Sequence, residues 1–184
     1  MKEKDMTQLS PIRVLHFTTK LNVGGVQSFL INYSRNIDHN KVAFDFVVQT
    51  TEKNVYDEEI INMGGKIYGV TPMSKSKYKY MKDIYAILKK HPEYKIVHAH
   101  LNFRNILPLS VAKIAGVKIR ISHSHSNYPP SNMFKKIQRT IFRIINQWIA
   151  TENWACSQSA GKWMYGNNKF YAHIWEKNAR SASA

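Results

Sequence analysis

Hydrophobic residues are grouped along the chain in two alternating kinds of segment. Short apolar, β-branched runs predict buried strands, and they span residues 12–18, 41–49, 66–70, 95–100, 117–122 and 153–157. Longer segments with apolar residues three and four positions apart predict helices, and they span residues 24–38, 57–65, 80–91, 105–115 and 132–148. A single helical turn is expected after the last strand, from residue 158. This alternation predicts an α/β fold in which helices cover both faces of a parallel sheet.

The predicted fold class is a Rossmann-like, three-layer α/β/α domain whose mainly parallel sheet has about six or seven strands. In open sheets of this kind, ligands bind in the crevice beyond the carboxyl ends of the strands. Residues that follow predicted strands are therefore the candidates for function. Three segments satisfy this condition, and we expect them to meet at one edge of the sheet: residues 22–25, 98–100 and 123–126.

The first segment is the loop Asn22-Val23-Gly24-Gly25, which joins the first strand to the first helix. Glycine lets a backbone approach a ligand closely, and the N-terminus of the next helix presents free N–H groups to an anion. Asn22, Gly24 and Gly25 are therefore candidate substrate-binding residues. A tight turn without a ligand explains a glycine pair equally well, because the loop is neither a Walker motif nor a dinucleotide-binding fingerprint.

The second and third segments carry two pairs of histidines. His98 and His100 end the fourth predicted strand, and His123 and His125 follow the fifth. No third metal ligand is recognisable near His98 and His100, so we expect no metal site and a structural role for at least one of them. A histidine at a strand end is also suited to bind a sugar hydroxyl or a phosphate. For His123 and His125, a solvated loop position is the alternative.

Segment 133–149 separates apolar from basic residues strongly. Its apolar positions form one stripe at helical spacing: Phe134, Ile137, Ile141, Ile144, Ile145 and Trp148. Four basic residues lie largely off that stripe and are candidate membrane contacts: Lys135, Lys136, Arg139 and Arg143. Such a helix is suited to lie on an anionic membrane surface. The commoner alternative is a surface helix that buries its stripe in the core.

The chain is strongly basic, with 27 Lys and Arg residues against 12 Asp and Glu, for a net charge of +15. Residues 94–184 carry 13 of the basic residues but only Glu152 and Glu176 as acids. This excess of positive charge favours an anionic partner, namely a nucleic acid, an anionic lipid or a phosphorylated small molecule. We expect no nucleic-acid partner, because the chain has no helix-turn-helix, RRM or KH signature.

Length and composition restrict the class of protein further. The 184 residues, 43% of them hydrophobic, are enough for one ordinary domain with a core. The single Cys156 excludes a disulfide scaffold, and we expect it to be a small buried residue in a reducing compartment. No run is long and apolar enough to span a membrane, and no secretory signal precedes Pro11. We therefore expect a cytoplasmic protein, either free or peripheral at the inner face of the cell membrane.

Five segments of the chain, in order, read HFTTKLNVGGVQSFLINYSRNID, KVAFDFVV, KIVHAHLNFRN, RISHSHSN and ACSQSAGKWMYG. Together they resemble the N-terminal half of family 4 retaining glycosyltransferases, above all those of bacterial capsular and exopolysaccharide synthesis. The resemblance covers residues 12 to about 171. It implies the GT-B architecture, in which two Rossmann-like domains face each other across a cleft. The N-terminal domain mainly holds the acceptor, and the C-terminal domain holds the nucleotide-sugar donor.

The resemblance also implies roles for individual residues. Gly24 and Gly25 match the glycine-rich loop near the donor phosphates, and His125 or His123 matches the active-site histidine, with spacing that favours His125. Further candidate substrate-binding residues accompany them in these loops: His98, His100, Asn102 and Ser126. The family needs no metal ion, because the donor's own phosphate assists departure of the nucleotide and basic residues offset the charge that develops there. No cofactor is expected, and the nucleotide sugar is a substrate of the complete enzyme.

The chain departs from the family after Lys169-Phe170-Tyr171, where it ends in AHIWEKNARSASA. The family continues with a segment like V-I-x-N-G-I-D and a donor-binding domain with an E-x7-E motif, neither of which the chain contains. We therefore predict an N-terminal extension at 1–11, an acceptor-side domain at 12–171 and a non-family tail at 172–184, with the donor-binding domain absent. The expected function is that of a glycosyltransferase N-terminal domain, inactive alone, for a glycan or lipid-linked acceptor. The alternative is a non-catalytic module that binds an acceptor or a partner.

Overall fold

The computed structural model describes residues 10–126, 132–166 and 169–172. The strands are β1 (Ile12–Phe17), β2 (Val42–Val48), β3 (Ile67–Gly69), β4 (Ile96–Ala99), β5 (Ile119–Ser124), β6 (Glu152–Ala155) and β7 (Tyr171–Ala172). The helices are α1 (Gly25–Asn36), α2 (Asp57–Asn62), α3 (Lys77–Lys90), α4 (Ile106–Ile114), α5 (Met133–Ile149) and α6 (Gln158–Tyr165), with a 3₁₀ turn, η1, at Asn102–Asn105. Most of the predicted extension and nearly all of the predicted tail lie outside the described residues.

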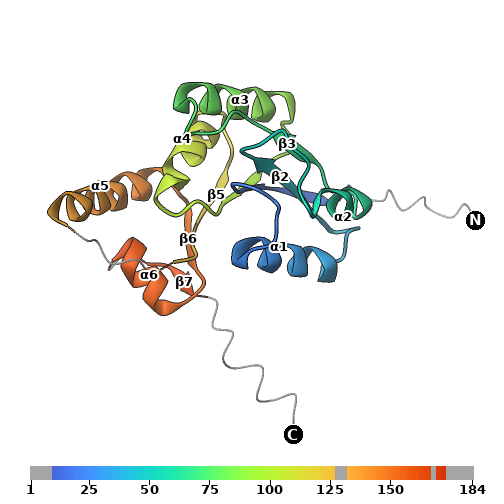
Figure 1. Cartoon of the computed structure of the whole chain (residues 1–184). Coiled ribbons are helices and arrows are strands. Elements are labelled where there is room, and N and C mark those ends of the chain that lie inside the picture. Colours follow the sequence, from blue (N-terminus) through green and yellow to red (C-terminus); the bar gives the residue numbers. More distant parts are fainter. Residues whose placement is uncertain (1–9, 127–131, 167–168, 173–184) are drawn as a thin grey trace, which may run out of the picture.

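The seven strands form one sheet in the order β3-β2-β1-β4-β5-β6-β7, and every neighbouring pair is parallel. A helix follows each of the first six strands and returns the chain to the start of the next strand (Figure 1). This is the doubly wound α/β arrangement. It confirms the Rossmann-like fold class predicted from the alternation of strands and helices.

Two groups of helices cover opposite faces of the sheet. On one face, here called the α1 face, α1 and α2 pack on β2 through Leu30, Phe46 and Ile60. On the other face, α3 and α4 pack on β1 and β4 in a cluster that includes Leu15 and Val97. Figure 1 shows α1 below the sheet and α3 and α4 above it. Because side chains alternate along a strand, each strand contributes to both layers.

Several elements differ from the sequence prediction. Helix α3 begins at Lys77 rather than Tyr80, because the Ser76 hydroxyl caps it by accepting from the Lys79 amide at 3.2 Å. Helix α6 has eight residues rather than a single turn. Strand β7 is only two residues long and therefore carries no readable pattern. Within the described part of the chain, no helix combines the length and the apolar character that crossing a membrane requires.

Candidate functional site

The second and third predicted site segments meet where β4 and β5 end. His100 Nδ1 lies 2.8 Å from His125 Nε2, and Asn102 Nδ2 donates to Ser126 Oγ over 2.9 Å. Because β4 and β5 are parallel neighbours, their carboxyl ends lie at the same edge of the sheet. The structure therefore brings these two segments together at one edge, as expected.

The glycine loop reaches the same edge through α1. The Phe29 ring of α1 lies 6.0 Å from the rings of both His123 and His125. A Cβ on Gly25 would have no neighbouring heavy atom within 4 Å, whereas a Cβ on Gly24 would lie 2.7 Å from Gln27 Oε1. Gly24 has an extended backbone with a φ of 175°, and neither glycine is in the left-handed region. Gly25 therefore leaves open space at the start of α1, and neither glycine serves an unusual backbone conformation.

Asn22 anchors this loop to the neighbouring one. Its Oδ1 accepts a hydrogen bond from the Val55 amide at 3.0 Å, and the Leu21 amide donates to Asn54 Oδ1 at 3.1 Å. The structure thus gives Asn22 a contact within the protein. Its predicted contact with a substrate stays a prediction.

Five histidines lie together on the α1 face, and we call them the histidine cluster: His16, His98, His100, His123 and His125. They come from three neighbouring strands, since His16 of β1 is paired in register with His98 of β4. His16 Nδ1 lies 3.0 Å from His100 Nε2, and His98 Nε2 lies 3.0 Å from His123 Nδ1. Sequence reasoning missed His16, because only the register of β1 against β4 reveals that it joins the other four.

Burial keeps the inner histidines neutral. It lowers the pKa of His16 to about 3, and together with the neighbouring imidazoles it lowers the pKa of His100 well below its usual value. A neutral imidazole has one N–H donor and one acceptor nitrogen. Neighbouring neutral rings can therefore satisfy one another by hydrogen bonds from nitrogen to nitrogen.

The prediction that His98 and His100 lack a third metal ligand was wrong. Two trios of ring nitrogens lie within 4.8 Å of one another, namely His16, His98 and His100, and His100, His123 and His125. The observed pairs at 2.8–3.0 Å are, however, closer than the spacing of about 3.3 Å between nitrogens that bind one zinc ion tetrahedrally. The geometry is that of hydrogen-bonded rings, which would have to separate to hold a metal.

The sequence predicted that His123 follows the fifth strand, but His123 lies inside β5. Strand β5 continues to Ser124 because His123 and Ser124 pair with Trp154 and Ala155 of β6. His123 is fully buried, whereas His125 is half-buried beyond the strand end. Of the two candidate active-site histidines, His125 is therefore the accessible one.

Two asparagines shape the loop beside His125. Asn102 has a φ of 53°, and its Oδ1 accepts from the His125 amide at 3.0 Å. This left-handed conformation is one that asparagine tolerates better than most residues. Asn105 is fully buried, accepts from the Leu101 amide at 2.6 Å and donates to Ser122 Oγ at 3.1 Å. The sequence did not single out Asn105, because burial alone distinguishes it from a surface asparagine.

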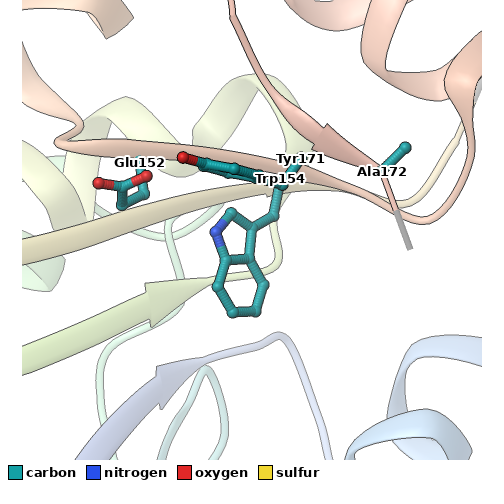
Figure 2. Close-up of a pocket in the computed structure, with 4 residues that line it drawn as sticks. All are labelled: Glu152, Trp154, Tyr171 and Ala172. Atoms are coloured by element: carbon teal, nitrogen blue, oxygen red, sulfur yellow. The ribbon is translucent and has the colours of Figure 1, made fainter.

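A shallow hollow of about 520 Å³ lies beside β6 and β7, away from the edge at which the site was predicted. It is lined by Glu152, Trp154, Tyr171 and Ala172, and Figure 2 shows the Trp154 indole projecting from β6. The Trp154 ring lies 5.2 Å from the His98 ring. The hollow therefore adjoins the histidine cluster, but His125 does not line it.

Cys156 lies just beyond β6 and is exposed. The expectation that it is buried was wrong, because the strand ends at Ala155.

The stripe of α5 is exposed, so the alternative that it packs in the core was wrong. Phe134 is 66% exposed, Ile137 51% and Trp148 73%, and the other three residues of the stripe are also exposed. The adjoining side of α5 buries Phe142 and Ile149 instead. Arg143 lies on that inner side, where its guanidinium donates to the carbonyls of residues 162–164 at the end of α6. Lys136 and Arg139 make no such contact with α6 among the hydrogen bonds of the described residues.

Comparison with known proteins identifies a relative in sequence and others in fold. The chain is 31% identical over 159 residues to a Bacillus subtilis (strain 168) protein named "Putative glycosyltransferase EpsF", across 85% of this chain and 41% of that protein. No protein-family model matches.

Two solved structures share the fold. Anabaena Alr3699/HepE, crystallised with UDP and glucose, has a TM-score of 0.59 and 13% identity over 89% of this chain and 45% of that one. A Listeria monocytogenes protein assigned as a UDP-N-acetylglucosamine 2-epimerase has a TM-score of 0.51 and 9% identity over 83% of this chain and 41% of that one. The chain thus spans less than half the length of each of these relatives.

Proposed function

We propose that this chain, a homologue of the glycosyltransferase EpsF with the Rossmann-like fold found in GT-B glycosyltransferases, is the acceptor-side domain of a sugar-transferring enzyme. The complete enzyme would move a sugar from a nucleotide-sugar donor to a glycan or lipid-linked acceptor in surface polysaccharide synthesis. The observation that carries this proposal is the 31% identity over 159 residues, because the fold alone is shared with an epimerase. The chain spans 41% of EpsF, so the activity of a complete enzyme is inferred and not observed.

The geometry of the carboxyl edge supports a substrate site there. His125 is half-buried, lies beside Phe29 of α1, and is held by Asn102 at its backbone amide. The open space at Gly25 lies at the start of the same helix. A substrate oxygen at this edge would therefore meet one imidazole and the amides of a helix N-terminus, both of which suit a sugar hydroxyl or a phosphate.

Transfer by a completed protein tests the proposal. The chain would be joined to the part of EpsF that it does not match, and sugar transfer from UDP-glucose and related donors to membrane extracts would be measured. We expect transfer by the joined protein, none by the chain alone, and a loss of about 10²-fold on His125→Ala. His91→Ala, at the C-terminus of α3 before β4 begins, is the matched control and should leave transfer unchanged. No transfer by the joined protein, together with normal folding, contradicts the proposal.

The alternative is a non-catalytic module that binds an acceptor or a partner. Donor binding and transfer must be measured together to separate the two functions, because the EpsF part of the joined protein is itself expected to bind the donor. Isothermal titration with UDP-glucose first establishes that the joined protein holds the donor, and transfer then decides between the two functions. Binding without transfer to any acceptor would favour the module.

We propose further that α5 docks on an anionic membrane surface, where lipid-linked acceptors are found. Its apolar stripe is exposed, and Figure 1 shows α5 at one end of the molecule, opposite α2. Basic residues near a membrane surface contribute about 1 kcal/mol each. Lys135, Lys136 and Arg139 would therefore support reversible docking, while Arg143 is committed to α6.

Vesicle sedimentation tests the docking. The chain should sediment with vesicles of mixed phosphatidylcholine and phosphatidylglycerol, but much less with phosphatidylcholine alone. Added salt should weaken binding because it screens exposed charges over about 8–10 Å. Replacing Lys135, Lys136 and Arg139 by Gln should abolish the difference between vesicles, whereas the same change at Lys77, Lys79 and Lys82 of α3 should not. Equal binding to both vesicles, or an unaltered triple variant, overturns the docking.

A further inference from the structure

Three members of the histidine cluster form a hydrogen-bonded chain from the interior of the sheet to the candidate site. His16 Nδ1 lies 3.0 Å from His100 Nε2, and His100 Nδ1 lies 2.8 Å from His125 Nε2. Both ring nitrogens of His100 are therefore engaged. His16 and His100 are buried, and His125 is half-buried at the carboxyl edge.

The hydrogen bonds couple the tautomers of the three rings. Each nitrogen-to-nitrogen contact holds one proton, and each neutral ring carries one N–H. Only two neutral arrangements satisfy both contacts. In the first, all three rings are protonated at Nδ1, so that His16 donates to His100 and His100 donates to His125. In the second, all three are protonated at Nε2 and both hydrogen bonds run in the opposite direction.

The inner end of the chain distinguishes these two arrangements. His16 Nε2 is buried and has no hydrogen-bond partner among the described residues. The rings of Phe44 and Phe46 lie 4.4 and 5.4 Å from the His16 ring and offer no acceptor oxygen or nitrogen. The second arrangement would bury an N–H there without an acceptor, and buried N–H groups without acceptors are rare because their desolvation is uncompensated. The first arrangement leaves only a nitrogen lone pair in the apolar surroundings.

We propose that the buried pair of His16 and His100 holds His125 as the Nδ1–H tautomer. His125 Nε2 is then committed to His100, and the ring offers a donor at Nδ1 to its other contacts. His16 and His100 act through His125 and are positioning residues. The inference rests on the proposed function only in that His125 is the candidate site residue.

Two further observations support a neutral chain of this kind. Burial lowers the pKa of His16 to about 3 and keeps the pKa of His100 well below its usual value, so neither ring is charged near pH 7. His98 and His123 form a separate contact, at 3.0 Å between Nε2 and Nδ1. That second pair has the same burial but is outside the chain that ends at His125, which makes it a matched control.

Long-range proton–nitrogen NMR of the ¹⁵N-labelled chain, at pH 7.5 in EDTA, reads the tautomer of each ring directly. EDTA removes any metal ion that would impose a tautomer by ligation. We expect about 90% or more of His125 in the Nδ1–H form, because the alternative requires the buried donor at His16. In His100→Gln, whose amide can replace Nε2 but not Nδ1, His125 should lose this preference. In His98→Gln it should keep it.

An Nε2–H pattern for His125 in the wild-type chain overturns the inference, and so does an unchanged Nδ1–H pattern in a folded His100→Gln chain. The wild-type spectrum decides the first point even if that variant fails to fold. The measurement needs no donor, acceptor or turnover. An Nδ1–H His125 in a protein that transfers no sugar would therefore contradict the proposed function while leaving the inference intact.

Discussion

Arg13 and Asp45 form an ion pair inside the sheet, with 2.6 Å between Arg13 Nε and Asp45 Oδ2. The Asp45 side chain is fully buried, and it also accepts from the Tyr94 hydroxyl at 2.8 Å and the Lys66 amide at 2.6 Å. The hydrogen bond to Asp45 raises the pKa of Arg13, and burial raises the pKa of Tyr94. The carboxylate thus joins β1, β2, the start of β3 and the segment before β4, at a distance from the candidate site.

Asp45→Asn should destabilise the protein strongly. The change removes the charge that balances Arg13 and leaves a neutral amide among donors, and breaking a buried pair in this way costs about 3–5 kcal/mol. Urea unfolding followed by circular dichroism measures the loss. Glu58→Gln, which breaks an exposed pair with Lys53, is the control and should leave the midpoint unchanged. A midpoint for Asp45→Asn equal to that of the control would show that the pair does not stabilise the sheet.

Stability should fall as the pH is lowered from about 6.5, before the carboxylates protonate. The pKa of His16 is about 3 in the folded protein and 6.5 in the unfolded chain, so the unfolded chain binds more protons between these two pH values. The stabilisation that His16 contributes is therefore fully present above pH 6.5 and is lost as the pH falls towards 3. At pH 5 the loss from His16 is about 2 kcal/mol, and His100 adds to it in the same direction.

Urea unfolding at pH 7.5, 6 and 5 measures this dependence. His16→Phe, which places an apolar ring beside Phe44 and Phe46, removes one of the two titrating groups and should reduce the slope, with the remainder due to His100. A variant with the wild-type slope would assign the pH dependence to other groups.

Asn102→Gly and Asn102→Ala should differ in stability. Both lose the hydrogen bonds from Asn102 to the His125 amide and Ser126. Only alanine also meets the strain of a φ of 53°, which makes it less stable than the glycine variant by about 1 kcal/mol. Thermal unfolding of the two variants provides the comparison, and a more stable alanine variant would contradict the left-handed conformation.

Cys156 should react with a thiol reagent in the folded protein. It is exposed beyond β6, and it is the single cysteine of the chain. We expect Ellman's reagent to modify one thiol at nearly the same rate with and without urea. Protection that is lost only on unfolding would place Cys156 in the interior.

The sequence by itself determined the order of the elements and the edge at which the site is built. The spacing of apolar residues is a local property, so the strands that precede His100 and His125 and the helix that begins at Gly25 were recognisable from neighbouring residues alone. Parallel pairing of such strands then requires their carboxyl ends to share an edge.

Only the tertiary structure decided which residues meet across the strands. His16 joins His98 and His100 because of the register of β1 against β4, a long-range relation that no local pattern carries. The same holds for α5, whose two sides both contain apolar residues. Phe134 and Phe142 are eight residues apart and therefore only about 80° apart around the helix, so helical period does not separate them. Contact with α6 is what buries Phe142, whereas Phe134 is exposed.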